Sequence, residues 1–115
     1  MKKKIILKPW GSEEILSHNK RYVLKKLTMK KGKRCSLQYH RKKHETVYVI
    51  SGKLKVSIGK SLKRMKSLSL KKNQSLILEP FIYHRMEGLE KTVYLEASTP
   101  QLSDVVRISD DYNRK

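Results

Sequence analysis

The stretch that decides the fold is residues 32–52, which reads GKRCSLQYHRKKHETVYVISG. It begins and ends with glycine, and a polar run at residues 41–43 divides it into two parts. The second part, residues 45–51, is rich in the β-branched and aromatic residues that are frequent in strands. We predict a strand over residues 34–40, a polar connection at residues 41–43 and a second strand over residues 45–51.

Potential metal ligands follow one face of this predicted strand pair. Residues two apart on a strand project to the same side, so Gln38 and His40 share a face with Arg34 and Ser36. Glu45 begins the second strand, where the residues on its own face are otherwise apolar. These offsets allow an amide, an imidazole and a carboxylate to reach one point. A polar row of this kind is either a solvent-exposed face or the lining of a pocket.

A fourth potential ligand, His84, lies alone on a distant apolar segment, with Ile82 and Met86 on the same strand face. A carboxylate or an imidazole within an apolar row needs a partner to offset its desolvation, and a divalent ion would satisfy both Glu45 and His84. The residues alone leave two other interpretations open. A solitary histidine on an apolar face is more often a hydrogen-bonded core residue than a ligand, and Glu45 could pair with a nearby lysine.

Outside this stretch the chain also has the pattern of short strands separated by turns. The most regular alternation lies at residues 53–58, where lysine and serine alternate with leucine, valine and isoleucine. Further strands are predicted at residues 13–16, 21–29, 62–70, 75–78, 84–87 and 92–97. The apolar residues of 62–70 also fit a loose helical spacing. About eight short strands with frequent turns indicate an all-β sandwich or barrel.

Length, charge and cysteine content limit the functional classes. We expect one domain over residues 1–115. The net charge of +18 favours anionic partners, but the basic residues are dispersed and mostly lysine, so we predict no specific nucleic-acid partner. A lysine-rich proteome would explain this charge as well. The single cysteine, Cys35, and the lack of a long apolar run predict a cytoplasmic protein with no membrane partner.

The spacing of the stretch resembles the first motif of cupin barrels: Gly, five residues, His-x-His, three or four residues, Glu, six residues, Gly. Gly32, His40, Glu45 and Gly52 occupy the corresponding positions, and Gln38 stands in place of the first histidine. The resemblance implies a cupin fold, which is a double-stranded β-helix or jelly-roll barrel.

The second cupin motif is matched more loosely, because His84 is kept while the proline is shifted by one residue and the glycine is absent. The closer resemblance is to the phosphomannose isomerase-like cupins, including the C-terminal domain of the bifunctional mannose-1-phosphate guanylyltransferase/mannose-6-phosphate isomerase enzymes. The residues that carry it extend over nearly the whole chain. They are Pro9-Trp10-Gly11, Leu37-Gln38-Tyr39-His40, His84-Arg85 and Val106-Arg107-Ile108-Ser109-Asp110-Asp111-Tyr112.

Isomerases of this kind use Gln, His, Glu and His as metal ligands, so the resemblance implies a divalent metal ion at Gln38, His40, Glu45 and His84. This donor set suits Zn, Fe, Mn or Ni and does not select among them. The implied reaction is aldose–ketose isomerisation of a sugar phosphate through a metal-stabilised enediolate, as for mannose 6-phosphate, in nucleotide-sugar or polysaccharide metabolism.

The remaining catalytic groups are less well determined. His44 is a candidate base because it adjoins Glu45, although a solvent-facing loop histidine explains it equally well. Arg34 shares the ligand face by strand parity and is a candidate phosphate ligand. Arg85 faces the other way, so it is a weaker candidate for an active-site role.

The resemblance also implies a homodimer, because dimers are common in such cupins, and Thr46, Tyr48 and Ile50 on the outer face of the second strand would supply the interface. Three other functions are compatible with the sequence. They are a different metal-dependent cupin enzyme such as an epimerase or dioxygenase, a non-catalytic sugar- or metabolite-binding module, and a basic polyanion-binding protein.

Overall fold

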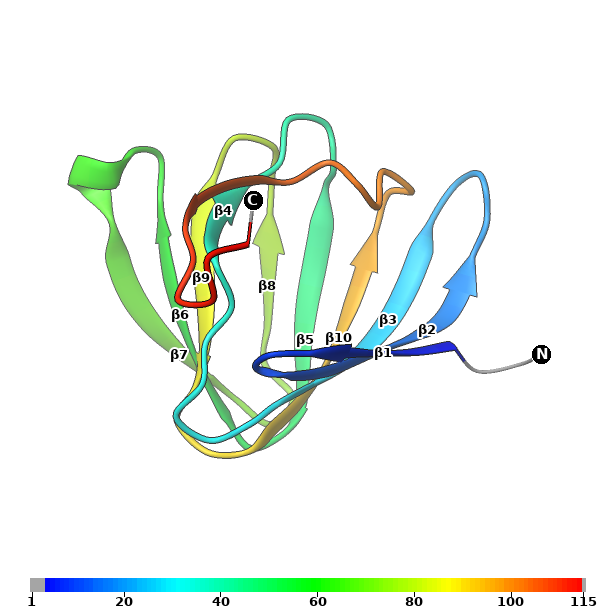
Figure 1. Cartoon of the computed structure of the whole chain (residues 1–115), viewed down its shortest axis with the longest axis horizontal. Coiled ribbons are helices and arrows are strands. Elements are labelled where there is room, and N and C mark those ends of the chain that lie inside the picture. The colour runs from blue at the N-terminus through cyan, green and yellow to red at the C-terminus, as the bar shows by residue number, and fades with distance from the viewer. Residues whose placement is uncertain (1–3, 115) are drawn as a thin grey trace.

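A computed structural model describes residues 4–114 of the chain (Figure 1). These residues form strands and one short 3-10 helix, η1. The order is β1 (Lys4–Lys8), β2 (Gly11–His18), β3 (Val23–Met29), β4 (Leu37–Tyr39), β5 (Glu45–Ser51), β6 (Lys53–Gly59), η1 (Leu62–Arg64), β7 (Lys66–Lys71), β8 (Ser75–Leu78), β9 (Tyr83–Gly88), β10 (Thr92–Ser98) and β11 (Val106–Ser109). Within residues 4–114 no helix has the length and apolar character needed to cross a membrane.

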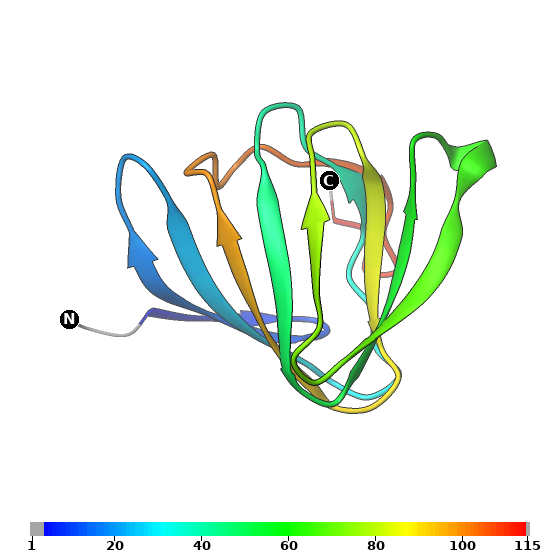
Figure 2. The same ribbon diagram turned by 180° about the vertical axis from the view of Figure 1, so that it is seen from behind.

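The strands of this described region form two antiparallel sheets, one of six strands and one of five. The first has the order β1-β2-β3-β10-β5-β8, and the second has the order β11-β4-β9-β6-β7. Figures 1 and 2 show that the sheets converge at the lower end and separate at the upper end. The connection from β10 to β11 crosses the upper end from one sheet to the other. The predicted all-β class is therefore confirmed.

Alternation along β5 shows how the core is formed and how a charged group enters it. Glu45, Val47 and Val49 are buried, whereas Tyr48 and Ile50 point outward and are exposed. Full burial of a valine side chain contributes about 1.5–3 kcal/mol, and a slip of one residue would expose both valines. The same register that buries the valines therefore holds the Glu45 carboxylate inside the barrel.

Both glycines that bound the deciding stretch have backbone angles that favour glycine. Gly32 has φ of 77° and Gly52 has φ of 88°, in a region that residues with a Cβ atom rarely adopt. At Gly52, which joins β5 to β6, a Cβ atom would also lie 2.3 Å from the carbonyl oxygen of Lys91. The tight turn after β5 therefore requires glycine for both its backbone conformation and its packing.

Strand boundaries agree with the prediction in some places and differ in others. β5 and β8 have the predicted bounds, but residues 62–70 do not form one strand, because η1 occupies their start. β4 is shorter than predicted, and Arg34 makes only an isolated bridge to Glu87. β1 and β11 were not predicted. Each lies at a sheet edge and has few buried residues, so neither carries a clear apolar alternation.

Candidate metal centre

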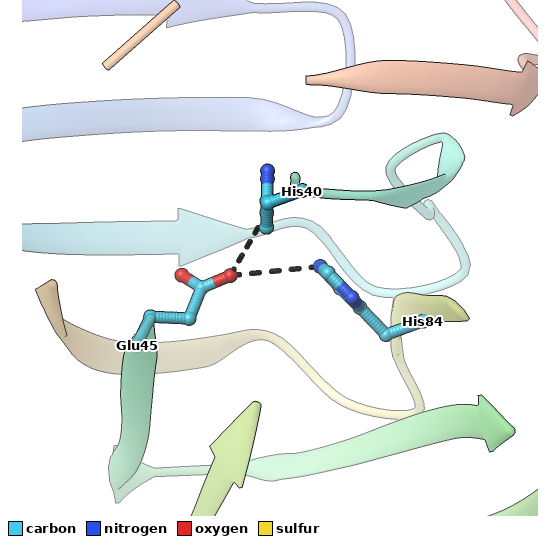
Figure 3. Close-up of side chains that lie close together, drawn as sticks. All are labelled: His40, Glu45 and His84. Atoms are coloured by element: carbon cyan, nitrogen blue, oxygen red, sulfur yellow. Dashed lines mark hydrogen bonds and ion pairs between the residues drawn. The ribbon is translucent and has the colours of Figure 1, made fainter. Parts of the chain in front are cut away.

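Among the described residues, His40, Glu45 and His84 form a buried cluster whose ligand atoms all lie within 4.8 Å of one another. His40 follows β4, Glu45 begins β5 and His84 lies on β9. Figure 3 shows both imidazoles directed at one carboxylate oxygen. Glu45 Oε1 lies 3.1 Å from His40 Nε2 and 3.6 Å from His84 Nε2. The fold thus brings together three of the four residues implied as metal ligands.

Backbone carbonyl groups orient both imidazoles in the same way. His84 Nδ1 lies 3.0 Å from the carbonyl oxygen of Ile82, and His40 Nδ1 is hydrogen-bonded to the carbonyl oxygen of Asp104. A carbonyl accepts but cannot donate, so each Nδ1 carries the proton and donates it. Each ring then presents Nε2 to the Glu45 carboxylate. Metal-ligating histidines are typically held by such a hydrogen bond from the other ring nitrogen.

The charge state of the cluster suits a cation. Burial raises the pKa of the Glu45 carboxyl, but the hydrogen bond with His40 and the charge of Lys43 outweigh burial and lower the pKa to about 2. Burial is the main reason that the pKa of His84 is lowered, which favours a neutral ring. A carboxylate oxygen that faces two ring nitrogens needs a proton or a cation between them.

An unpaired oxygen of Glu45 is a second reason to expect a cation at the cluster. Glu45 Oε2 is buried and has no hydrogen-bond partner within the described chain, although Lys43 Nζ lies 3.9 Å away. Buried polar atoms without partners are uncommon in folded proteins. One carboxylate and two imidazoles match the donors preferred by Zn, Fe and Ni, so the residues present fit a divalent metal ion.

A cavity of about 130 Å³ adjoins the cluster inside the barrel. Its wall combines apolar groups such as Trp10, Leu27 and Tyr94 with charged groups of both signs. The cationic side chains come from β1, β3, the β4–β5 connection and the C-terminal segment, which is residues 106–114. They are Lys8, Lys25, Lys43, Arg107 and Arg114. The acidic ones are Glu13, Glu45 and Glu96. The wall thus carries more cations than acids, and three of the cations are paired within the protein: Lys25 with Glu13, Lys43 with Glu45 and Arg114 with Asp110.

Comparison with known sequences shows the family of the chain. The profile of the family described as "Mannose-6-phosphate isomerase C-terminal" matches residues 1–110. The chain belongs to this family. It is 30% identical to the xanthan biosynthesis protein XanB of Xanthomonas campestris pv. campestris, 29% to the mannose-1-phosphate guanylyltransferase of Escherichia coli (strain K12) and 30% to the alginate biosynthesis protein AlgA of Pseudomonas aeruginosa. Each alignment covers 95% of this chain and 23% of the relative, so the chain spans only that part of their length.

Solved structures with the same fold include KdgF from Halomonas sp., with a TM-score of 0.76 and 13% identity over 90% of this chain and 91% of KdgF. Oxalate decarboxylase of Bacillus subtilis has a TM-score of 0.78 and 20% identity, covering 91% of this chain and 30% of that one. The capsular polysaccharide assembling protein CapF from Staphylococcus aureus has a TM-score of 0.77 and 16% identity. The alignment covers 94% of this chain and 34% of the CapF chain. At these identities the likeness shows the fold, and the predicted cupin barrel is confirmed.

Gln38, the ligand position that distinguishes this cupin from the His-x-His pattern, lies beside the cluster. It pairs with His84 across β4 and β9, and its side chain lines the same cavity as His40 and Glu45. The structure therefore places Gln38 on the wall next to the three clustered residues. Its role as a fourth ligand stays a prediction from the family resemblance.

Glu96 is a cavity residue that the sequence analysis missed. Burial, followed by the nearby charge of Glu45, raises the pKa of the Glu96 carboxyl to about 8. The signal was present in the sequence, since Glu96 shares a β10 face with the buried residues Thr92 and Tyr94. This is the same pattern of a carboxyl within an inward row that singled out Glu45.

The structure places Arg34 and Arg85 outside this cavity. Arg34 donates from Nε and Nη2 to Asp111 at N···O distances of 2.7 and 2.9 Å. Arg85 donates to the carbonyl oxygen of Cys35 at 2.8 Å and to Asp111 at 3.1 Å. Residue 34 lies before the start of β4, so strand parity does not carry it to the ligand face. Both guanidinium groups instead hold the C-terminal segment against the barrel.

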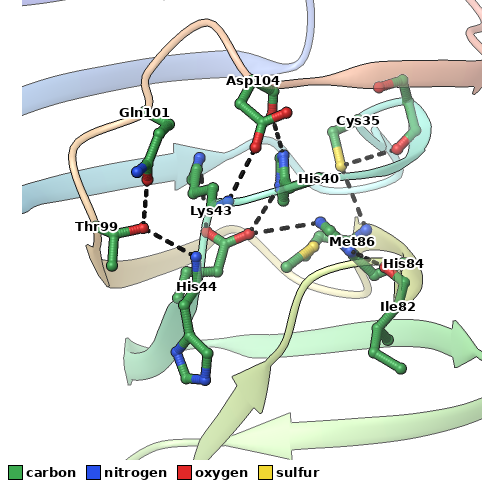
Figure 4. Close-up of polar contacts among 12 residues, drawn as sticks. Cys35, His40, Lys43, His44, Ile82, His84, Met86, Thr99, Gln101 and Asp104 are labelled. Atoms are coloured by element: carbon green, nitrogen blue, oxygen red, sulfur yellow. Dashed lines mark hydrogen bonds and ion pairs between the residues drawn. The ribbon is translucent and has the colours of Figure 1, made fainter.

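His44 is exposed, and its ring points away from the cluster (Figure 4). Its backbone N–H donates to Thr99 Oγ1 at an N···O distance of 3.0 Å. His44 immediately precedes Glu45, whose side chain faces inward, and neighbouring residues of an extended chain project in opposite directions. This placement gives no support to His44 as the base.

Proposed function

We propose that the chain is a metal-dependent sugar-phosphate isomerase that interconverts mannose 6-phosphate and fructose 6-phosphate. The observation that carries the proposal is the buried cluster of His40, Glu45 and His84 beside a cavity with cationic walls. Membership of a family described by mannose-6-phosphate isomerase supports the choice of reaction. Names of the relatives that refer to mannose 1-phosphate and to polysaccharide biosynthesis are consistent with a mannose-derived substrate.

The cations of the cavity account for recognition of the phosphate group. Arg107 and Arg114 come from the C-terminal segment, whereas Lys43 comes from the connection between β4 and β5. Guanidinium groups form strong, charge-assisted hydrogen bonds with phosphate oxygens, and lysine adds a compact positive charge. In the proposed complex these groups bind the phosphate and thereby orient the carbonyl end of the hexose toward the cluster.

Isomerisation moves one proton between C1 and C2, of which one is the carbonyl carbon and the other carries a hydroxyl group. It also moves one hydroxyl proton between the oxygens on these two carbons. The chemistry that a bound divalent ion supplies is Lewis-acid polarisation of a carbonyl. Glu96 is proposed as the group that removes the proton from one carbon and returns it to the other, so that its own charge is restored after each turnover. A carboxyl with a pKa of about 8 suits both steps near neutral pH.

A coupled assay of fructose 6-phosphate formation from mannose 6-phosphate tests the proposal, using protein loaded in turn with Zn²⁺, Mn²⁺, Fe²⁺ and Ni²⁺. Glu96→Gln should abolish turnover while metal content stays at the wild-type level. Glu90→Gln is the matched control, because Glu90 is exposed and lies outside the cavity. Metal-loaded wild-type protein that gives no turnover with either sugar phosphate would refute the assignment.

A second function, a non-catalytic module that binds a small anionic metabolite, is favoured by the size of the cavity. Its volume of about 130 Å³ is below the roughly 300–1,000 Å³ of common ligand pockets. Turnover of a hexose phosphate therefore requires this cavity to widen. Saturable binding of mannose 6-phosphate by calorimetry without turnover would favour the binding module.

We also propose that the chain forms a homodimer through the outer face of β5 and β8. Tyr48 and Ile50 on β5 and Ile77 on β8 are exposed. Thr46 pairs with Ile77 across the two strands, so these side chains share one face of the sheet. Adjacent exposed apolar residues are typical of protein interfaces. Light scattering of the purified chain tests this assembly.

A further inference from the structure

The connection between β4 and β5 separates the two candidate ligands that are closest in sequence. His40 stands at one end of this connection and Glu45 at the other, with residues 41–44 between them. His40 Nε2 and Glu45 Oε1 must stay at the 3.1 Å separation seen here, or at the similar short range that a shared ion demands. Whatever holds the backbone of residues 41–44 therefore influences the geometry of the site.

The carboxylate of Asp104 holds three consecutive backbone N–H groups of this connection. Its Oδ1 accepts from Arg41 at an N···O distance of 3.1 Å, and its Oδ2 accepts from Lys42 at 2.7 Å and from Lys43 at 2.9 Å. Successive N–H groups that converge in this way form a concave anion site. In this protein that site is filled by a side chain from the segment between β10 and β11.

The same residue also contacts the His40 ring, through its backbone carbonyl oxygen and His40 Nδ1 (Figure 4). One residue thus fixes the backbone next to His40 and the orientation of its imidazole. We propose that Asp104 is a positioning residue for the metal centre, which directs His40 Nε2 toward Glu45 by holding both the connection and the ring. This proposal rests on the metal site of the proposed function, and it assigns Asp104 no contact with metal or substrate.

Neighbouring contacts show that the connection is held along its whole length by one segment. The N–H of His44 donates to Thr99 Oγ1 at 3.0 Å, and the N–H of Thr99 donates to the carbonyl oxygen of His44 at 3.0 Å. Thr99 Oγ1 in turn lies 2.6 Å from Gln101 Oε1. Thr99 therefore fixes the end of the connection next to Glu45, while Asp104 fixes the end next to His40.

The experiment compares Asp104→Asn with Asp111→Asn in the full chain. Asparagine has the size of aspartate but offers one acceptor oxygen and two N–H donors, so it cannot accept from all three backbone groups. Asp111 is a matched control because it also ties the C-terminal segment to the barrel, through Arg34 and Arg85, without touching the cluster. The first readout is the affinity of the metal-free chain for Zn²⁺ and Co²⁺ alone.

The second readout is the tautomer of His40, obtained from the ¹⁵N chemical shifts of its ring in the metal-free chain at about pH 8, where an ordinary histidine is neutral. The proposal expects the Nδ1–H form in the wild type and a mixture of tautomers in Asp104→Asn. It also expects Asp104→Asn to weaken Zn²⁺ and Co²⁺ binding by about 10–100-fold, as loss of groups that orient metal-ligating histidines does. Asp111→Asn should leave both readouts at wild-type values.

Two results would overturn the positioning role: unchanged affinity and tautomer in Asp104→Asn, or an equal loss of affinity in both variants. The equal loss would indicate general loosening of the C-terminal segment. If the wild type binds neither Zn²⁺ nor Co²⁺, the metal site of the proposed function is refuted. The His40 tautomer is then the one readout that tests the positioning role of Asp104. A tautomer change confined to Asp104→Asn would still establish the orientation of His40, and no change would refute it.

Discussion

Replacing Glu96 by glutamine is expected to change the pH dependence of stability in the metal-free protein. The pKa of the Glu96 carboxyl is raised from the ordinary value of 4.5 to about 8, mainly by burial and then by the charge of Glu45. The folded state therefore keeps this proton at pH values where the unfolded chain has released it. Between these two pKa values, each rise in pH favours the unfolded chain.

The size of the effect follows from the two pKa values. Each pKa unit corresponds to about 1.36 kcal/mol, so a shift to about 8 represents up to about 5 kcal/mol of destabilisation at alkaline pH. Glutamine resembles the protonated carboxyl and stays neutral at every pH. The free energy of unfolding of Glu96→Gln minus that of the wild type should therefore be smallest below pH 4.5 and should rise until the pH passes about 8.

Urea denaturation in the presence of a chelator, repeated from about pH 4 to about pH 9, measures this difference. The slope between the two pKa values should approach about 1.4 kcal/mol per pH unit. Glu90→Gln removes the charge of an exposed carboxylate and should give a curve parallel to that of the wild type. A Glu96→Gln difference that stays flat across the whole range would show that Glu96 is ionised in the folded state, and would remove the reason for assigning it the proton transfer.

Three further outcomes are expected. His84→Ala should lower affinity for Zn²⁺, measured by calorimetry, by more than the roughly 10–100-fold caused by loss of a group that orients a ligand. A folded variant with wild-type affinity would exclude His84 from the site. Gly52→Ala should lower the free energy of unfolding by at least about 1 kcal/mol because of its positive φ and the contact with the Lys91 carbonyl oxygen, and an unchanged urea midpoint would contradict this account of the turn. Ile77→Lys should convert a dimer to a monomer in light scattering without loss of the folded circular dichroism spectrum, since a charge would enter the proposed apolar interface; a dimer that persists would place the interface elsewhere.

The parts of the fold and site that depend on local alternation could be predicted from the sequence. The bounds of β5 follow from its β-branched residues, and the inward direction of Glu45 follows from its parity with Val47 and Val49. The approach of His84 to Glu45 was inferred from apolar surroundings and from motif spacing. Alternation determines which face a side chain takes, and desolvation then requires that a buried charge find a partner.

The parts that depend on contacts between distant segments could not be predicted in this way. Arg34 pairs with Asp111, 77 residues further along the chain, and no local pattern signals that ion pair. The role of Asp104 depends on the path of the β10–β11 segment across the open end of the barrel. Strand parity also fails for Arg34, because the regular strand begins only at Leu37. Glu96 differs, since the parity argument used for Glu45 would have identified it.

The crossing of the β10–β11 segment over the barrel has a consequence for the order in which contacts form during folding. His40 and Asp104 are 64 residues apart, so the imidazole acquires its Nδ1 partner only after a long loop has closed. Contacts of such sequence separation form late and slowly in folding. If the proposed metal site holds, the rate of metal uptake by the refolding protein would report formation of the contact between His40 and Asp104.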